Sequence, residues 1–285
     1  MSFKDVLLLL VVVVNAYFAF VFVKDLLAHK NDIMSEKANT LALPFTSAII
    51  FFLSTVGISD FAISTSLYPK LHWTSVKKLP GTLNTQCTIP VAVMALAYIT
   101  SIEVSVTTLV VCIVSQMVGS YFGAKFAVKL PAEKLKVSIG IGMIIAALII
   151  FGGKFGLLPG GGDATALTGM KLVIAAVALA IFGALNNIGI GSYALTMITV
   201  YLLGLNPAVA FPIMMGAATF SVPVGSVQFV KSGEYSRKIN LCTSTFGVFG
   251  VLCAVFVITS LDTVILQWFV AFILLYSAYG MLKKN

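Results

Sequence analysis

The sequence predicts an all-α polytopic membrane protein, and two observations lead to that class. Hydrophobic residues make up 59% of the 285 residues, charged residues only 10%, and the mean hydropathy is +1.05. A soluble domain carries roughly 25% charged residues, so this chain has too little polar surface to cover a water-exposed body. Apolar runs near the length of a bilayer span, about 20 residues, also recur along the chain. They cover 6–23, 44–68, 80–99, 104–128, 136–152, 170–203, 206–230, 240–260 and 263–282.

Reactive and charged residues are placed in a way that argues against several function classes. The four cysteines (Cys87, Cys112, Cys242 and Cys253) lie in apolar runs without metal-ligand spacing, and both histidines lie in polar segments. Without a Ser-His-Asp, Cys-His or two-carboxylate arrangement, we expect neither an enzyme nor a metal or cofactor site. The formal net charge is +8, but the basic residues occupy short segments between apolar runs. This pattern favours membrane topology over nucleic-acid binding.

The first apolar run, 6–23, is longer than the core of a signal peptide, and no small-x-small cleavage site follows it before Lys24. We therefore expect a retained N-terminal helix. The predicted organisation is an N-terminal transmembrane helix with a cytoplasmic loop (1–43), a first repeat (44–152), a linker (153–169) and a second repeat (170–285).

An internal repeat is visible at a period of 131–133 residues. The segment GISDFA at 57–62 aligns with GIGSYA at 189–194. The other matches follow in the same order: Leu79–Pro80 with Phe211–Pro212, IPV at 89–91 with VPV at 222–224, Gly119 with Gly250, and Leu130 with Leu261. Each repeat is predicted to hold one interrupted helix followed by three uninterrupted transmembrane helices.

The interruptions are clusters of helix-breaking residues at matching places. GISD follows 44–56 in the first repeat, and NNIGIGS at 186–192 follows 171–185 in the second. Glycine costs about 1 kcal/mol inside a helix, and Ser, Asn and Asp prefer caps and turns. Non-helical backbone at membrane depth is tolerated where it is buried in protein or lines a wet cavity, and paired interruptions mark transporter sites. A packing kink is the alternative interpretation.

Basic residues favour an inverted arrangement of the two repeats. If each broken helix dips into the membrane and returns, each repeat crosses three times, and 15 of the 18 basic residues fall on one side. Only Lys4, Lys154 and Lys171 then lie outside. This predicts an inner-membrane protein with the N-terminus outside and the C-terminus inside. An unwound helix that spans fully is the alternative.

A returning helix leaves unpaired backbone N–H groups at the start of its second half, at the positive end of its dipole, and such starts bind anions. We expect these starts, with the polar residues of the following helices, to bind a small anion, and we expect no metal there. The predicted substrate-binding residues are Gly57, Ser59, Asp60, Thr65, Asn84, Gln86, Cys87, Thr88, Asn186, Asn187, Gly189, Gly191, Ser192, Thr219 and Ser221. Any single hydroxyl can instead bond to its own helix, so the cluster carries the prediction.

Asp60 is the one carboxylate expected deep in the membrane, where ionisable groups are functional candidates. Desolvation favours the neutral acid, so Asp60 could accept a coupling proton. It could instead cap the following half-helix. A cation carrier centred on Asp60 is a further alternative.

At these residues the chain resembles a known family. The run GIGSYALTMITVYLLGLNPAVAFPIMMGAATF at 189–220 is similar to the glycine-rich signature of the TauE/SafE sulfite exporter family, and GISDFAISTSLYPKL at 57–71 resembles a degenerate copy. The resemblance implies an inner-membrane carrier for sulfite, organosulfonates or related sulfur oxyanions. Ser192 and Tyr193 depart from the family's richer glycine run, as do Ser59 and Asp60 in the first repeat. A membrane assembly or regulatory subunit would explain the hydrophobicity, but not the paired interruptions.

Overall fold

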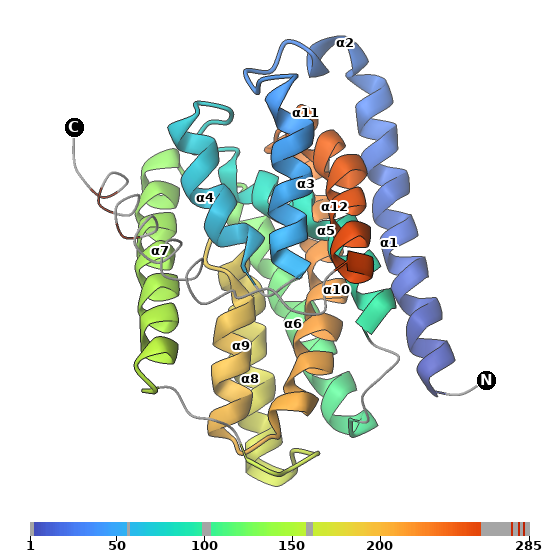
Figure 1. Cartoon of the computed structure of the whole chain (residues 1–285), viewed down its shortest axis with the longest axis vertical. Coiled ribbons are helices and arrows are strands. Elements are labelled where there is room, and N and C mark those ends of the chain that lie inside the picture. Colours follow the sequence, from blue (N-terminus) through green and yellow to red (C-terminus); the bar gives the residue numbers. More distant parts are fainter. Residues whose placement is uncertain are drawn as a thin grey trace.

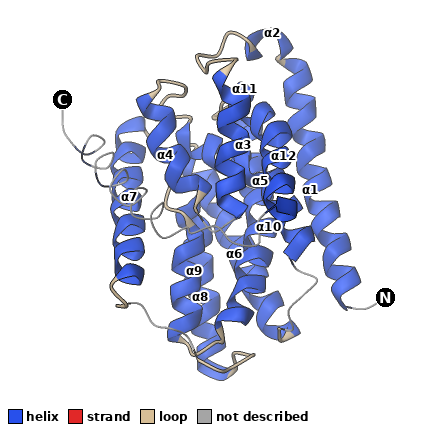
Figure 2. Ribbon diagram, in the orientation of Figure 1, coloured by secondary structure: helices blue, strands red, loops and turns tan. Residues whose placement is uncertain are grey.

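A computed structural model describes residues 3–55, 58–98, 104–157 and 162–257, together with positions 275, 279 and 282. Gly57, Leu261 and most of the predicted last helix (263–282) lie outside the described residues. Within them the chain is almost wholly helical (Figure 2), apart from one isolated bridge between Ala164 and Leu205, which confirms the all-α class. The helices are α1 (Phe3–Ala28), α2 (Lys30–Ile33), α3 (Ala42–Thr55), α4 (Asp60–Lys70), α5 (Leu79–Tyr98), α6 (Val106–Ala127), α7 (Ala132–Lys154), α8 (Gly169–Asn186), α9 (Ser192–Leu202), α10 (Pro207–Ser232), α11 (Arg237–Cys242), the π-helix η1 (Thr243–Gly247) and α12 (Val248–Val257).

Six helical segments of the described chain are long and apolar enough to cross a membrane. They are α1, α6, α7, α8, α10 and the continuous run α11–η1–α12. The 20-residue α5 has a comparable length, but its first half carries polar residues (Thr82, Asn84, Thr85, Gln86 and Thr88), which lower its hydropathy. Together these segments fit a multi-pass membrane protein.

The outer surface of the bundle suits a lipid environment. Large apolar side chains point outward from several helices, among them Phe20, Phe122, Leu148, Ile181 and Phe256. Each of these side chains is at least half exposed. In water such a surface would promote association, whereas in a bilayer it contacts acyl chains.

Each interrupted helix forms a hairpin of two helices, and the two hairpins repeat one another at an offset of 132 residues. Their second helices, α4 and α9, both have 11 residues. The backbone bond from Ile58 N to Leu53 O recurs from Ile190 N to Leu185 O. Two residues beyond each second helix the backbone has a positive φ, at His72 and at Gly204. The repeat read from the sequence is therefore present in the local structure of the hairpins.

The loops of the bundle gather at two opposite ends. We call the segments 29–41, 71–78, 128–131 and 233–236 the basic end. Lys77 Nζ bonds there to the carbonyls of Val128 and Leu130, both at 2.7 Å, and Thr82 Oγ1 accepts the N–H of Ser236. The described parts of 104–105, 155–168 and 203–206 form the far end, where 162–164 pair with 204–206.

The two hairpins begin and end at different ends of the bundle (Figure 1). The α3–α4 hairpin starts and finishes at the basic end, whereas α8–α9 starts and finishes at the far end. At 1.5 Å per residue, the 14 residues of α3 rise about 21 Å, short of the roughly 30 Å hydrocarbon core. α8 is long enough to cross by itself, but the chain returns through α9 to the end where α8 began.

Close helix contacts are reciprocal between the two repeats. A Cβ added at Gly119 of α6 would overlap the Ala180 carbonyl of α8, and one at Gly250 of α12 would overlap the Ala48 carbonyl of α3. Ala180 and Ala48 are related by 132 residues, and the two glycines by 131. The α6 helix of the first repeat thus packs against the hairpin of the second, and α12 of the second repeat packs against the hairpin of the first.

One helix differs from its predicted form. We expected an uninterrupted helix over 240–260; its described part is one continuous run but contains a π-helical turn at Thr243–Gly247, between α11 and α12. Gly247 at its end lies against the Phe51 ring of α3, which leaves no room for a side chain. π-helical turns inside α-helices are uncommon, and this one lies where the second repeat packs on the first hairpin.

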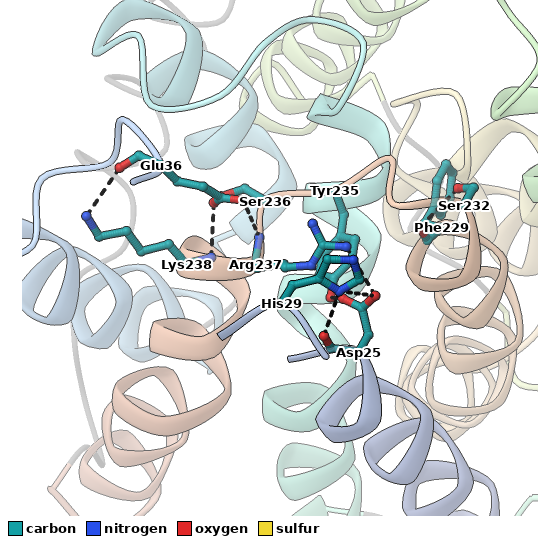
Figure 3. A network of polar contacts seen from close by, with 9 residues as sticks. All are labelled: Asp25, His29, Glu36, Phe229, Ser232, Tyr235, Ser236, Arg237 and Lys238. Carbon is teal, nitrogen blue, oxygen red and sulfur yellow. Dashed lines mark hydrogen bonds and ion pairs between the residues drawn. The ribbon is translucent and has the colours of Figure 1, made fainter. Parts of the chain in front are cut away.

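The N-terminal helix is fastened to the second repeat at the basic end (Figure 3). Arg237 binds the Asp25 carboxylate through Nε at 2.7 Å and Nη2 at 3.1 Å, and Tyr235 donates its hydroxyl to the same group at 2.5 Å. Burial, reinforced by Asp25, raises the pKa of Tyr235, so its phenol stays protonated as a donor. Glu36 accepts the N–H groups of Arg237 and Lys238 and so caps α11. We call these contacts the α1 clamp.

Valine at Gly119 or Gly250 should destabilise the protein, because its Cβ would overlap a backbone carbonyl that cannot move aside. We expect each change to lower the free energy of unfolding by about 1–3 kcal/mol or more, measured as a lower thermal midpoint in detergent. The control Val118→Ile adds a methylene at a position that is 48% exposed and should change nothing. Unaltered stability of both glycine variants would contradict the packing described.

Candidate functional site

The two interruptions meet at one place inside the bundle. Ser59, Asp60 and Phe61 at the start of α4 line the same cavity as Gly189, Ile190 and Gly191 before α9. A Cβ added at Gly191 would lie 3.8 Å from the Cβ of Phe61. The cavity has a volume of about 730 Å³ and is walled further by α5, α7, α9 and α10. Residues of both interruptions therefore line one cavity.

A second, smaller void of about 30 Å³ adjoins this place. Its wall includes both helix starts, together with Cys87 of α5 and Asn186 at the end of α8. A space of this size holds about one water molecule. It lies between Asp60 and Ser192, which are equivalent residues of the two repeats.

The start of α4 presents a carboxyl group. Ser59 is the N-cap residue, and its Oγ accepts the N–H of Ala62 at 3.3 Å. Asp60 is the first residue of the helix, so the alternative that Asp60 is the N-cap is wrong. Its Oδ1 accepts a hydrogen bond from Ser54 Oγ at 3.2 Å, whereas its buried Oδ2 has no partner. An unpartnered buried carboxylate oxygen calls for a proton or a ligand.

The start of α9 presents backbone N–H groups instead. Gly191 occupies the N-cap position and has no side chain with which to cap the helix. Asn186 Oδ1 accepts the N–H of Ser192 at 3.0 Å, so the preceding helix caps the following one. The next two N–H groups, of Tyr193 and Ala194, lie in the first turn, which lacks intrahelical acceptors, and both residues line the cavity. The two helix starts are thus equivalent in backbone and different in charge.

A pair of asparagines joins the repeats beside the site. Asn186 Nδ2 donates to Asn84 Oδ1 at 2.8 Å, and Asn84 Nδ2 donates to the Asn186 carbonyl at 3.1 Å. Both side chains are buried. Because Asn186 also caps α9, this pair fixes the end of α8 and the start of α9 against α5. The sequence predicted both as substrate-binding residues; Asn186 borders the small void, whereas Asn84 is not in the described lining of either space.

Several predicted residues hold helices together and do not line the large cavity. Gln86 bonds to Tyr68 Oη at 2.6 Å and to Ser64 Oγ at 2.9 Å, which joins α5 to α4. Thr88 meets Ser226 of α10 at 3.1 Å. The side chain of Asn187, directly after α8, donates to the carbonyl of Ser120 in α6, and Ser120 donates to the carbonyl of Ser221 in α10. The carbonyl of Thr219 accepts from Asn15 of α1. Asn187, Thr219 and Ser221 are all buried.

Three of the remaining predicted residues border one of the two spaces at the site. Thr65 lines the large cavity, but its hydroxyl donates to the carbonyl of Phe61 in its own helix, at 2.5 Å. Cys87 borders only the small void, and Gly189 lines the large cavity with a φ of +93°. Gly57 lies outside the described residues.

Sequence reasoning missed two groups of residues at the site. Gln116 of α6 donates to Ser221 Oγ at 3.0 Å and to Ser192 Oγ at 3.4 Å, which links the start of α9 to α6 and α10. The only feature of the sequence that pointed to Gln116 was its position as a single glutamine within an apolar run. The second group is five of the ten methionines, which line the large cavity: Met94, Met143, Met197, Met214 and Met215. Methionine is flexible and polarisable, so this wall can adapt to its contents.

Comparison with known proteins leaves the chain without an assigned family. No family model matches it, and searches of curated proteins and of solved structures return no match. Among the described residues, no group of three or more His, Cys, Asp or Glu side chains could hold a metal ion.

The asparagine pair can be tested by a double-mutant cycle. Asn84→Ala and Asn186→Ala should each cost about 1–3 kcal/mol, because each leaves a buried amide unpaired. Together they should show a coupling energy of about 0.5–3 kcal/mol, measured from thermal or denaturant unfolding. Asn84→Ala combined with Thr245→Ala, an exposed hydroxyl bonded within its own helix, should be additive. Additivity of the asparagine pair would contradict the contact.

Proposed function

We propose that this protein is a secondary transporter for a small anion. The observation that carries the proposal is the meeting of two half-helix starts in one cavity inside a bundle with an apolar outer surface. Helix starts supply N–H donors and a positive potential without a bound cation. Interrupted helices in the two halves of a chain are the usual construction of secondary transporter sites. An assembly or regulatory subunit would need no such cavity.

We further propose that the two repeats are inverted in the inner membrane and that both hairpins are re-entrant. Hairpins that begin at opposite ends, and reciprocal contacts between repeats, support this arrangement. The positive-inside rule then puts the basic end in the cytoplasm. On this assignment the N-terminus lies outside and the C-terminus inside.

This topology can be tested by cysteine labelling in a background that lacks the four native cysteines. Single cysteines replacing Lys129 or Lys231, both exposed at the basic end, should react with an impermeant reagent only from the cytoplasm. A cysteine replacing Asp163, exposed at the far end, should react only from outside. Labelling of positions 129 and 231 from different sides would overturn the inverted arrangement.

The start of α9 is the proposed anion site. Tyr193 and Ala194, whose N–H groups belong to the first turn of α9, line the cavity, and Asn186 already accepts the N–H of Ser192. The resemblance of 189–220 to the TauE/SafE sulfite exporter family makes sulfite the first probe, with organosulfonates and related sulfur oxyanions after it.

Leucine at Gly191 should abolish sulfite binding while the protein still purifies as one species. The backbone there has a φ of −57°, and an added Cβ meets only the Phe61 side chain at 3.8–4.0 Å, so neither the backbone nor the Cβ is strained by the change. The longer side chain would fill the space in front of the helix start. Calorimetry of sulfite binding is the measurement, with Gly191→Ala as the smaller control. Undiminished binding by Gly191→Leu would move the site elsewhere.

Asp60 is the proposed coupling group, which carries one proton with the anion. An ionised carboxylate near the site raises the free energy of a bound anion, and a low dielectric strengthens that repulsion. Protonation of Asp60 and binding of the anion therefore favour each other by reciprocal coupling. The unpartnered Oδ2 is the atom available to the proton.

Asp60→Asn should retain anion binding, lose most of its pH dependence and slow proton-coupled flux. In the unmodified protein, binding should weaken as the pH rises through the titration of Asp60, because the ionised form repels the anion. An asparagine amide can still accept from Ser54 and carries no charge at any pH. Sulfite binding and flux in proteoliposomes, measured across pH, are the readouts.

Two results would contradict this coupling role. If Asp60→Asn leaves the pH dependence of transport intact, another group carries the proton. If the protein binds sodium, loses it on substitution and never binds an anion, it is a cation carrier centred on Asp60.

A further inference from the structure

The large cavity extends from the helix starts toward the far end. On α7 its lining begins at Gly142, where an added Cβ would lie 3.1 Å from the Gly189 carbonyl oxygen, beside the second interruption. The lining continues to Lys154 in the last turn of α7. At 1.5 Å per residue, these positions are about 18 Å apart along the helix. Lys154 therefore stands at the outer part of a cavity whose inner part holds Asp60.

Toward the basic end, the described residues close the site. Tyr68 of α4 and Leu83 and Gln86 of α5 have no exposed surface. The bonds of Gln86 to Tyr68 and Ser64 fasten the two helices together at this level. Among the described residues, the cavity is thus extended on the side of Lys154 and filled on the opposite side.

Lys154 is the one basic residue in the described lining of this cavity. Among the residues that the structure describes, no carboxylate lies within ion-pair distance of it. The carbonyl groups at the end of α7 stabilise a cation there, so Lys154 can keep its charge without a carboxylate partner. Lys171, another basic residue at the far end, lies beside Gly204 and outside the lining.

We propose that Lys154 captures the anion at the far end of the cavity, before it reaches the start of α9. This inference rests on the proposed transport function and adds a second, outer position to it. A positive group at the mouth of a low-dielectric cleft raises the local concentration of anions and their rate of entry. The five methionines of the lining carry no charge, so they offer the anion no second cationic partner inside the cavity.

The inference predicts an effect that depends on the side of the membrane. Uptake of labelled sulfite is measured in proteoliposomes of known orientation, with substrate added from either face and at several salt concentrations. Lys154→Gln should raise the KM about tenfold at low salt for sulfite added at the far end. Its maximal rate from the far end and its KM from the basic end should not change. Its maximal rate from the basic end should fall by the same factor as the far-end KM rises, because a substitution cannot alter the equilibrium of transport. The salt dependence of uptake from the far end should also decrease, because screening has no charge left to act on.

Two control variants make the test specific. Lys154→Arg keeps the charge and should behave like the unmodified protein. Lys171→Gln removes a charge at the same end but outside the cavity lining and should also leave the KM unchanged. An unchanged KM in Lys154→Gln, or an equal rise from both faces, would overturn the capture role. Absence of sulfite flux in the unmodified protein would instead contradict the proposed function itself, and the inference with it.

Discussion

Backbone polar groups cannot remain unpaired inside a bilayer, and the two interrupted helices of this chain must meet that condition. The structure meets it with short-range and cross-repeat bonds. Ile58 and Ile190 donate back to the preceding helices, and the Asn84–Asn186 pair closes the second interruption from α5. Close packing of α6 and α12 on the opposite hairpins, through Gly119 and Gly250, encloses both interruptions in protein. The first turn of α9 remains at the wall of the cavity, through Tyr193 and Ala194.

The repeat places two equivalent helix starts together, but their chemistry differs. Position 60 carries a carboxyl group and position 192 a hydroxyl, although both are first residues of 11-residue helices. The repeat explains the shared backbone. In the proposed function, the difference in side chain puts the proton at position 60 and the anion at the start of α9. A site with two identical starts would attract an anion equally to both and would lack a titratable neighbour. The asymmetry is therefore the chemically informative part of the repeat.

The positions of the interruptions could be predicted from the sequence, whereas the direction of most side chains could not. Gly and Asx clusters disfavour helix wherever they occur, so GISD and NNIGIGS locate the two breaks, and Gly119 and Gly250 already aligned across the repeat. The sequence does not readily show which face of a helix points into the bundle, because both faces of a helix in a membrane bundle are apolar. Gln86 was therefore predicted as a substrate-binding residue but bridges to Tyr68, and the position of Met143 in the cavity lining was not predicted. The link from Gln116 to Ser192 required the packing of α6 to be known.

The α1 clamp has a consequence for the order in which the chain is made. Asp25 and Glu36 come from the start of the sequence, whereas their partners Tyr235 and Arg237 come some 200 residues later. Chains emerge from the ribosome N-terminus first, at about 5–20 residues per second. For at least about ten seconds, therefore, Asp25 and Glu36 have been synthesised while the residues that bind their carboxylates have not. The α1 clamp can therefore form only after residues 235–238 of the second repeat have been synthesised.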